Sequence, residues 1–584
     1  YTCPIDVLPI LIPFEDYRLR PNPGVIRRYK GTSSNILFVG RVVPNKKQED
    51  VIKAFAYYQK YYNEKELLLY TIEKTNPALK GALPDNYYSR LHIDTAKLAS
   101  LLDEINRINT EDEENDIIGR VYEYFLSKFA LAEGKGKGEF YTPKCIVNLI
   151  AEMLEPYDGT LYDPCCGSGG MFVQSIKFVE AHSGNKKKVS IYGQEYTNTT
   201  FKLAKMNLAI RGISANLGEE AANTFSNDQH KDLKADYIMA NPPFNVDKVK
   251  SETAQNAGRL PFGLPGVNKN KEIGNANYLW ISYFHAYLNE TGRAGFVMAS
   301  SATDSQGKDK DIRQQLVATG DVDVMLSVGN NFFYTKSLPC TLWFFDKAKR
   351  TENKDKVLFI DARNYYTAVD RTLNEWSEWQ MKNLNAIVWL YRGETEKYTA
   401  LLNEYKQILG QALPFEEILT LLEEGRAELQ RRAKIEVEHA GRNDKKRVQA
   451  HYDEMIAAKN AEITIAKEAI WLTEKFGDGE YKDVLGLCKL ADRAEIADKG
   501  YSLTPGAYVG VAPVEDDGVD FAAPKGTPIY AAYNGIVVAA TYSSTMGNYV
   551  MIDHGEGLFT IYMHASKLIA KEDQIVLRGE KIAE

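Results

Sequence analysis

Residues 160–170 read Thr-Leu-Tyr-Asp-Pro-Cys-Cys-Gly-Ser-Gly-Gly: a short apolar run, an acidic residue and a glycine-rich turn. Further apolar, strand-like runs end at Glu195, Ala240, Ser300 and Gly329, with helical patterns between several of them. Strands that alternate with helices indicate an α/β fold with a mostly parallel, doubly wound sheet. Ligands of such sheets bind at the carboxyl ends of the strands, so we expect the chemistry in the residues that follow those ends.

Composition and charge narrow the class of protein. The chain has 584 residues, 44% apolar and 26% charged, which is ordinary globular composition and excludes a disordered or fibrous protein. No apolar run approaches the ~20 residues that span a bilayer, and the first residues do not resemble a signal peptide. Six cysteines are too few for a disulfide framework, so we expect a cytoplasmic protein. With a net charge of −8, the chain needs a local basic surface or another subunit to hold a polyanion.

The first candidate segment is Glu139-Phe-Tyr-Thr-Pro-Lys144. Thr142 can N-cap a helix, Pro143 suits its first position, and Pro156 marks its end. The expected buried face of this helix is Ile146, Leu149, Ile150, Met153 and Leu154, at helical spacing. A well-capped helix with no binding role is the alternative interpretation.

The second candidate is the turn Asp163–Gly170. Its glycines let the backbone approach a ligand closely, and Asp163 can accept hydrogen bonds from a ligand ammonium or hydroxyl group. The pattern is neither GxGxxG nor a P-loop, and a plain tight turn is the alternative. Cys165 and Cys166 are adjacent and lack metal-ligand spacing, so we expect both to be packing residues.

Two further strand ends carry candidate residues. Glu195 closes the apparent second strand and can accept hydrogen bonds from both hydroxyls of a ribose; a solvated acid is the alternative. Asn241-Pro-Pro-Phe244 follows a later strand, whose ladder the two prolines end. The rigid loop can present the Asn241 side-chain carbonyl and the Pro242 backbone carbonyl to an exocyclic amine, and Phe244 can stack on an extruded base. An Asn-Pro-Pro turn with a core Phe is the alternative.

Together these motifs carry a family resemblance. Residues of about 70–515 resemble the methylation (M) subunit of type I restriction–modification systems, an S-adenosylmethionine-dependent N6-adenine DNA methyltransferase with a Rossmann-like core. The segments at 140–143, 163–170 and 241–244 stand in that family's order, as do 76–84 and 228–230. Asn223 departs from the acid that many relatives carry near the cofactor adenine, which bears on cofactor affinity rather than on reaction type.

The resemblance also implies roles for individual residues. The implied cofactor-binding residues are Glu139, Phe140, Tyr141, Thr142, Pro143, Lys144, Asp163, Gly167, Ser168, Gly169, Gly170 and Glu195. The implied catalytic residues, which hold the flipped adenine, are Asn241, Pro242, Pro243 and Phe244. Direct transfer needs no covalent enzyme intermediate, so the site must align the amine with the methyl group and exclude water. Methylation of protein glutamine or RNA guanine, and a non-catalytic scaffold role, remain open alternatives.

The resemblance divides the chain into regions with expected partners. Residues 70–138 form a helical lead, 139–380 the methyltransferase domain, and 381–515 a helical tail for partner binding. The implied partners are DNA, a specificity subunit, a second methylation subunit and a restriction (nuclease/translocase) subunit, and no membrane. The isolated chain is then expected to bind DNA weakly and to methylate it only in the complex.

The two ends resemble other families, so the chain reads as a chimera or a misjoined sequence. Residues 1–69 resemble a truncated GT-B glycosyltransferase around 40–46. Residues 516–584 resemble a truncated lysostaphin-like zinc peptidase of all-β structure, with His564 as a catalytic neighbour. Asp516 stands where that family has a zinc-binding His, which leaves Asp520 alone of the metal set, so no bound metal is expected.

Overall fold

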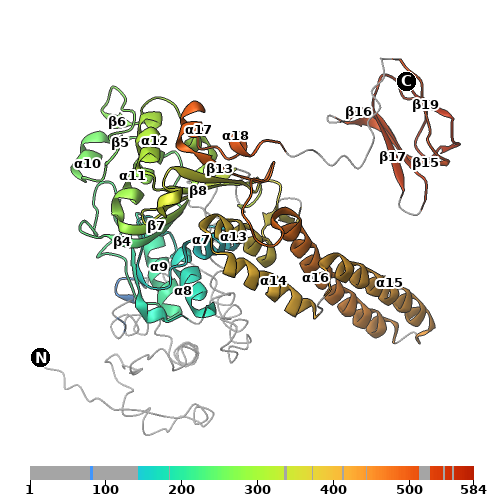
Figure 1. Cartoon of the computed structure of the whole chain (residues 1–584), viewed down its shortest axis with the longest axis horizontal. Coiled ribbons are helices and arrows are strands. Elements are labelled where there is room, and N and C mark those ends of the chain that lie inside the picture. Colours follow the sequence, from blue (N-terminus) through green and yellow to red (C-terminus); the bar gives the residue numbers. More distant parts are fainter. Residues whose placement is uncertain are drawn as a thin grey trace, which may run out of the picture. The chain divides into compact units, whose positions relative to one another are not determined.

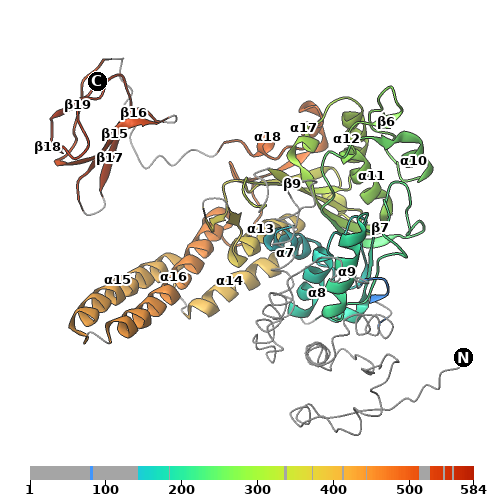
Figure 2. The same ribbon diagram turned by 180° about the vertical axis from the view of Figure 1, so that it is seen from behind.

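The computed structural model describes residues 76, 79–82, 142–182, 184–333, 339–370, 373–410, 413–441, 444–511, 526–543, 546–555 and 558–584. The chain divides into two compact units, residues 1–512 and 513–584 (Figures 1 and 2). Several predictions fall outside the described residues: the glycosyltransferase-like fragment, most of the helical lead, and the side chains of Glu139, Phe140, Tyr141, Asp516 and Asp520.

The first unit is built on a nine-stranded sheet, counted over the described residues. In spatial order its strands are β13 (Cys488–Asp492), β10 (Lys356–Asp361), β8 (Val322–Val328), β9 (Cys340–Asp346), β7 (Leu288–Ala299), β4 (Ala235–Ala240), β1 (Gly159–Asp163), β2 (Val189–Gly193) and β3 (Ala215–Asn216). Neighbours from β3 to β7 run parallel. The predicted doubly wound α/β fold is confirmed.

The sheet is mixed, because β9 runs antiparallel to both β7 and β8, and β13 runs antiparallel to β10. Every residue of β8 and β9 is buried. A strand that is covered on both faces is apolar throughout, whether it runs parallel or antiparallel to its neighbours. The sequence of β9 therefore does not indicate its antiparallel orientation.

Helices cover both faces of the sheet, and alternate strand residues point to opposite sides. Leu161 of β1 and Met239 of β4 lie in the core cluster with α7 (Lys144–Leu154), α8 (Gly170–Ala181) and α9 (Asn198–Ile210). Tyr162 and Ile238 lie in the opposite cluster with α11 (Asn277–Tyr287) and α12 (Lys308–Thr319). The unit also contains the short helices α10 (Ser251–Asn256), α17 (Arg493–Asp498) and α18 (Gly506–Val509), and two small strand pairs: β5 (Val249–Lys250) with β6 (Glu272–Ile273), and β11 (Thr367–Ala368) with β12 (Asn374–Glu375).

The expected helical tail is present and reaches the sheet. It consists of α13 (Glu378–Arg392), α14 (Thr395–Leu409), α15 (Phe415–His439) and α16 (Lys445–Phe476). Helices α15 and α16 form a hairpin, and α16 packs on α13 and α14 (Figures 1 and 2). Beyond α16 the chain returns as β13 to the sheet edge, which the sequence pattern did not indicate.

The second unit is all-β in its described residues, as expected. Strands β17 (Phe559–Ala565), β16 (Gly547–Asp553), β15 (Gly535–Ser543) and β18 (Ile575–Val576) form one antiparallel sheet, and β14 (Ile529–Tyr530) pairs with β19 (Lys581–Ala583). Its core is small and includes Val537, Val550 and Ile552. Among the described residues of the whole chain, no helix is long and apolar enough to cross a membrane.

Candidate active site

The candidate site lies where the strand order reverses. Strand β1 has β2 on one side and β4 on the other, so the chain builds outward to β3 and then returns to the opposite flank of β1. The loops that leave β1 and β4 diverge above this point, which is where open α/β sheets bind ligands. These loops are the glycine-rich turn after Asp163 and the Asn241–Phe244 segment.

A hydrogen bond joins the first predicted segment to the last. The Asn241 side-chain Nδ2 donates to Thr142 Oγ1 at 2.9 Å, across 99 residues of sequence. The predicted N-cap role of Thr142 is wrong: α7 begins at Lys144, Pro143 occupies the cap position, and no side chain caps the helix. Because the amide nitrogen of Asn241 faces Thr142, its carbonyl oxygen points away from Thr142.

The helix after this junction has the predicted buried face. Its five expected apolar positions are all at most 1% exposed: Ile146, Leu149, Ile150, Met153 and Leu154. Glu155 adopts a left-handed conformation after the last turn, one residue before Pro156. The buried face packs α7 into the core, and Thr142 lies two residues before this helix begins.

The glycine-rich turn is held by hydrogen bonds from three directions. Cys165 N–H donates to Asp163 Oδ1 at 3.0 Å, and Gly167 N–H donates to Glu195 Oε2 at 3.0 Å. Asn207 Nδ2 of α9 donates to the Ser168 carbonyl at 2.7 Å. Gly169 takes a positive φ of 80°, where a side chain would be strained, and Gly170 begins α8.

Glu195 lies two residues beyond the end of β2, because that strand stops at Gly193. The prediction that Glu195 closes the strand is therefore wrong by two residues. Its carboxylate is mostly buried and accepts from Gly167 N–H and from Thr197 N–H, the latter at 2.7 Å. These two bonds fix the Glu195 carboxylate between the glycine-rich turn and the start of α9.

Burial changes the pKa of the Asp163 carboxyl group. Its side chain is 1% exposed, and desolvation raises the pKa of the carboxyl to about 7, although hydrogen bonds from Cys165 act in the opposite direction. The nearby Glu195 charge raises this pKa further. Burial also raises the pKa of the Cys165 and Cys166 thiols well above their usual value, which suits their expected packing role.

The loop after β4 is locked at its exit by an asparagine pair. Asn245 has a left-handed φ of 56°, and its N–H donates to Asn277 Oδ1 at 2.9 Å. In return, Asn277 Nδ2 donates to Asn245 Oδ1 at 3.0 Å, as does Asn275 Nδ2 at 2.9 Å. Asn277 is buried at the start of α11. Pro242 is also buried, whereas Phe244 is half-buried and packs against the α7 side of the core.

The sequence patterns did not identify Asn245, Asn275 and Asn277. They also did not predict that Gln194 and Asp228 are buried and hydrogen-bonded close to the site. Gln194 is fully buried; its Nε2 donates to Ala222 O and Asn227 O, and its Oε1 accepts from Gln229 N–H. Asp228 binds the Arg259 Nε at 2.9 Å and the Tyr287 hydroxyl at 2.7 Å. These bonds hold the Asp228–His230 segment between Gln194, the residue before Glu195, and Tyr287 of α11.

Comparison with known proteins decides the family. The N-6 DNA Methylase family model matches residues 113–408. The HindI methylase subunit of a type I restriction enzyme from Haemophilus influenzae is 35% identical over 460 residues, which cover 77% of this chain and 83% of that protein. The chain belongs to the type I restriction enzyme methylase subunits.

A second relative supports this assignment, and a solved structure shares the fold. The MjaIX methylase subunit from Methanocaldococcus jannaschii is 31% identical over 458 residues, which cover 77% of this chain and 65% of that protein. The fold resembles the crystal structure of a type I methyltransferase subunit from Streptococcus thermophilus, with a TM-score of 0.53 and 19% identity over 79% of this chain and 81% of that one.

The last residues of this methylase-family chain match a different family. Residues 515–584 match the Peptidase family M23 model, which supports the predicted peptidase-like fragment. His564 lies on β17 with a left-handed φ of 54°. Within the described residues, no group of three His, Cys, Asp or Glu side chains is placed to hold a metal ion.

Asn223, which stands where many relatives carry an acid, lies in the loop that Gln194 holds. Its Oδ1 accepts from Phe225 N–H at 2.9 Å in a local turn. The preceding Ala222 N–H donates to the Glu195 carbonyl at 2.8 Å, so Asn223 is tied closely to the candidate cofactor residues of this methylase.

Proposed function

We propose that this chain is the modification subunit of a type I restriction–modification system and transfers a methyl group from S-adenosylmethionine to N6 of an adenine flipped out of DNA. The observation that carries the proposal is the 2.9 Å hydrogen bond between Asn241 and Thr142. It joins the two loops that must meet if one holds the cofactor and the other holds the base.

The residues beside β1 suit this cofactor. S-adenosylmethionine presents an ammonium group and ribose hydroxyls, which are donors, and Asp163 and Glu195 are buried carboxylate acceptors at adjacent loops. Asp163 is proposed to accept from the ammonium and Glu195 from the ribose hydroxyls. The backbone of Gly167–Gly170 and the residues from Glu139 to Lys144 would complete this binding surface.

At the other side of the site, the base is proposed to be held by two acceptors. Asn241 Oδ1 and the Pro242 carbonyl would bind the two N–H groups of the adenine amine, with Phe244 stacked on the ring and Pro243 stiffening the loop. When bound, the cofactor supplies an electrophilic methyl group, so the protein provides alignment and water exclusion rather than a nucleophile. The high pKa of the Cys165 and Cys166 thiols is consistent with their taking no part.

The test is methyl transfer by the chain with its cognate specificity subunit. Tritiated S-adenosylmethionine is supplied with duplex DNA, RNA and protein substrates, and the intact chain is compared with residues 70–515. Label on N6 of adenine in DNA is expected. Label on protein glutamine or RNA guanine would replace this proposal, and absence of cofactor binding by calorimetry would indicate a scaffold. Cytoplasmic location and assembly with a second methylation subunit and a restriction subunit belong to the same proposal.

A further inference from the structure

The two halves of the α15–α16 hairpin carry net charges of opposite sign. We define its distal half as residues 426–451 and its proximal half as residues 415–425 and 452–476. The distal half has eight basic and four acidic residues, a net charge of +4, whereas the proximal half has three basic and nine acidic residues, a net charge of −6. A chain with a net charge of −8 thus concentrates positive charge at one end of this hairpin.

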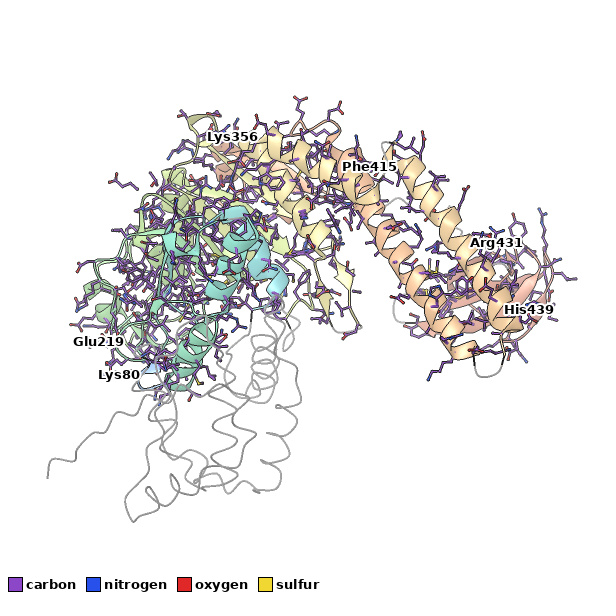
Figure 3. The ribbon with its side chains drawn as sticks, turned by 90° about the horizontal axis from the view of Figure 1, so that it is seen from below. Lys80, Glu219, Lys356, Phe415, Arg431 and His439 are labelled. Carbon is purple, nitrogen blue, oxygen red and sulfur yellow. The ribbon has the colours of Figure 1, made fainter. Side chains whose placement is uncertain are left out.

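The three distal lysines face solvent. Figure 3 shows Phe415 at the start of α15, in the proximal half, and Arg431 and His439 toward the end of α15, in the distal half. Lys434, Lys445 and Lys446 are exposed, and no carboxylate of the described residues lies within ion-pair distance of them.

The proximal lysines, in contrast, are engaged within the hairpin. Lys459 pairs with Glu462 at 2.6 Å, and Lys467 pairs with Glu423 of the facing helix at 3.6 Å. Lys475 lies 4.7 Å from the centre of the Trp471 ring. Three distal arginines are engaged as well: Arg431 and Arg432 pair with Glu428 at 3.5 and 2.8 Å, and Arg447 pairs with Asp444. Among the described residues of the hairpin, the lysines without such a partner are Lys434, Lys445 and Lys446 of the distal half.

The basic residues at the start of α16 destabilise that helix. Lys445, Lys446 and Arg447 form the first turn of α16, which contains no acidic residue. Cations at this end of a helix are unfavourable, because the helix dipole is positive there. Asp444 offsets part of the cost by pairing with Arg447 at 3.1 Å. Exposed cations at the start of a helix lower its stability, and such unfavourable local choices are typical of functional surfaces, so we infer that the charge has a function.

The distal surface suits a polyanion better than an apolar partner. Among its described residues, Ile435 is the one large apolar side chain that is strongly exposed, at 57%. Exposed Leu413 and Leu421 lie instead near the start of α15, where a protein partner could pack. The hairpin therefore separates an apolar, acidic base from a basic end.

We propose that the distal half of this hairpin contacts the phosphate backbone of duplex DNA without reading its sequence. The inference rests on the proposed function, since that function requires a negatively charged chain to hold DNA. The distal part of α15, residues 426–439, has 14 residues and is about 21 Å long. At about 3.4 Å per base pair, that length corresponds to roughly six base pairs, or about half a turn of DNA. Contacts there would hold phosphates away from the flipped base and offset the repulsion of the acidic body.

The test compares two variants with the same change in net charge. The distal variant is K434A/K445A/K446A, and the matched control is K459A/K467A/K475A in the proximal half. Each is assembled with the cognate specificity subunit, and binding of a fluorescent duplex is measured by anisotropy over a series of salt concentrations. We expect the distal variant to lower the slope of log affinity against log salt by about 0.9 for each phosphate that is no longer neutralised, on specific and nonspecific duplexes alike. The control should keep the wild-type slope.

Three results bear on the proposal separately from the methylation chemistry. Equal slopes for the distal variant and the control would overturn it. Loss of assembly with the specificity subunit on sedimentation, with an unchanged slope, would assign the surface to a protein partner instead. Methyl transfer at saturating DNA is measured alongside: if the wild type binds DNA but transfers no methyl group, the proposed function fails while the DNA contact stands. The distal variant should fold normally, because alanine favours helix at all three exposed positions and the removed Lys445 and Lys446 oppose the dipole of α16.

Discussion

Asp163→Asn should make the unliganded protein more stable while weakening its binding of S-adenosylmethionine. Burial raises the pKa of this carboxyl from 3.8 to about 7, so the folded state prefers the protonated form. A raised folded-state pKa means that stability is highest at low pH and is lost as pH rises from about 4 through about 7. At about 1.36 kcal/mol per pK unit, the ionised group costs up to about 4 kcal/mol at pH 8, of which about 2 to 3 kcal/mol develops between pH 5 and 8.

Asparagine removes this cost and keeps the oxygen that accepts from Cys165 N–H. The assay is urea unfolding of wild type and variant at several pH values, followed by tryptophan fluorescence. All six tryptophans lie between residues 280 and 471, so the signal reports the first unit. The stability advantage of the variant should grow from pH 5 to pH 8, while calorimetry should show weaker cofactor binding.

A matched control is the same substitution at Asp323, which is also 1% exposed. Burial opposes its ionisation, but Arg392 at 2.9 Å and the Lys349 ammonium outweigh burial and lower its pKa. Asp323→Asn should therefore lose stability at neutral pH. An Asp163→Asn protein that is no more stable at pH 8 than at pH 5 relative to wild type, or that binds cofactor as tightly as wild type, would refute the reasoning.

Three further substitutions test the site. Asn241→Ala should lower kcat at least about 100-fold, because one transition-state contact is worth that much, and should leave cofactor affinity unchanged in calorimetry. Thr142→Val removes the 2.9 Å bond to Asn241 and should lower kcat by about 3- to 10-fold in single-turnover assays; an unchanged rate would mean that Thr142 does not position Asn241. Asn277→Ala should destabilise the fold by about 1–3 kcal/mol and lower kcat, because it removes both bonds of a buried side chain to Asn245. Asn275→Ala also removes two bonds, one to Asn245 Oδ1 and one from Asn277 N–H, but it should be milder because Asn275 is only half-buried. Equal effects of the two asparagine variants in urea unfolding and kinetics would contradict the proposed lock.

Local chemistry in the sequence determined where the candidate site begins and ends. Apolar periodicity marked the buried face of α7, and prolines marked the end of β4, because backbone geometry restricts these patterns within a few residues. The glycines after Asp163 and the Asn241-Pro-Pro-Phe loop were readable for the same reason. The resemblance of these motifs in their order then supplied the family, which the comparisons confirmed.

Tertiary structure decided what those residues contact. Thr142 looked like a helix cap because capping is a local rule, but its hydroxyl serves Asn241 from 99 residues away. The direction of β9, the return of β13, and the Asn245–Asn277 pair likewise depend on partners distant in the sequence. The pKa of Asp163 depends on water excluded by the whole fold. Hydrogen bonding and desolvation are set by the packed three-dimensional surroundings, so no local sequence pattern records them.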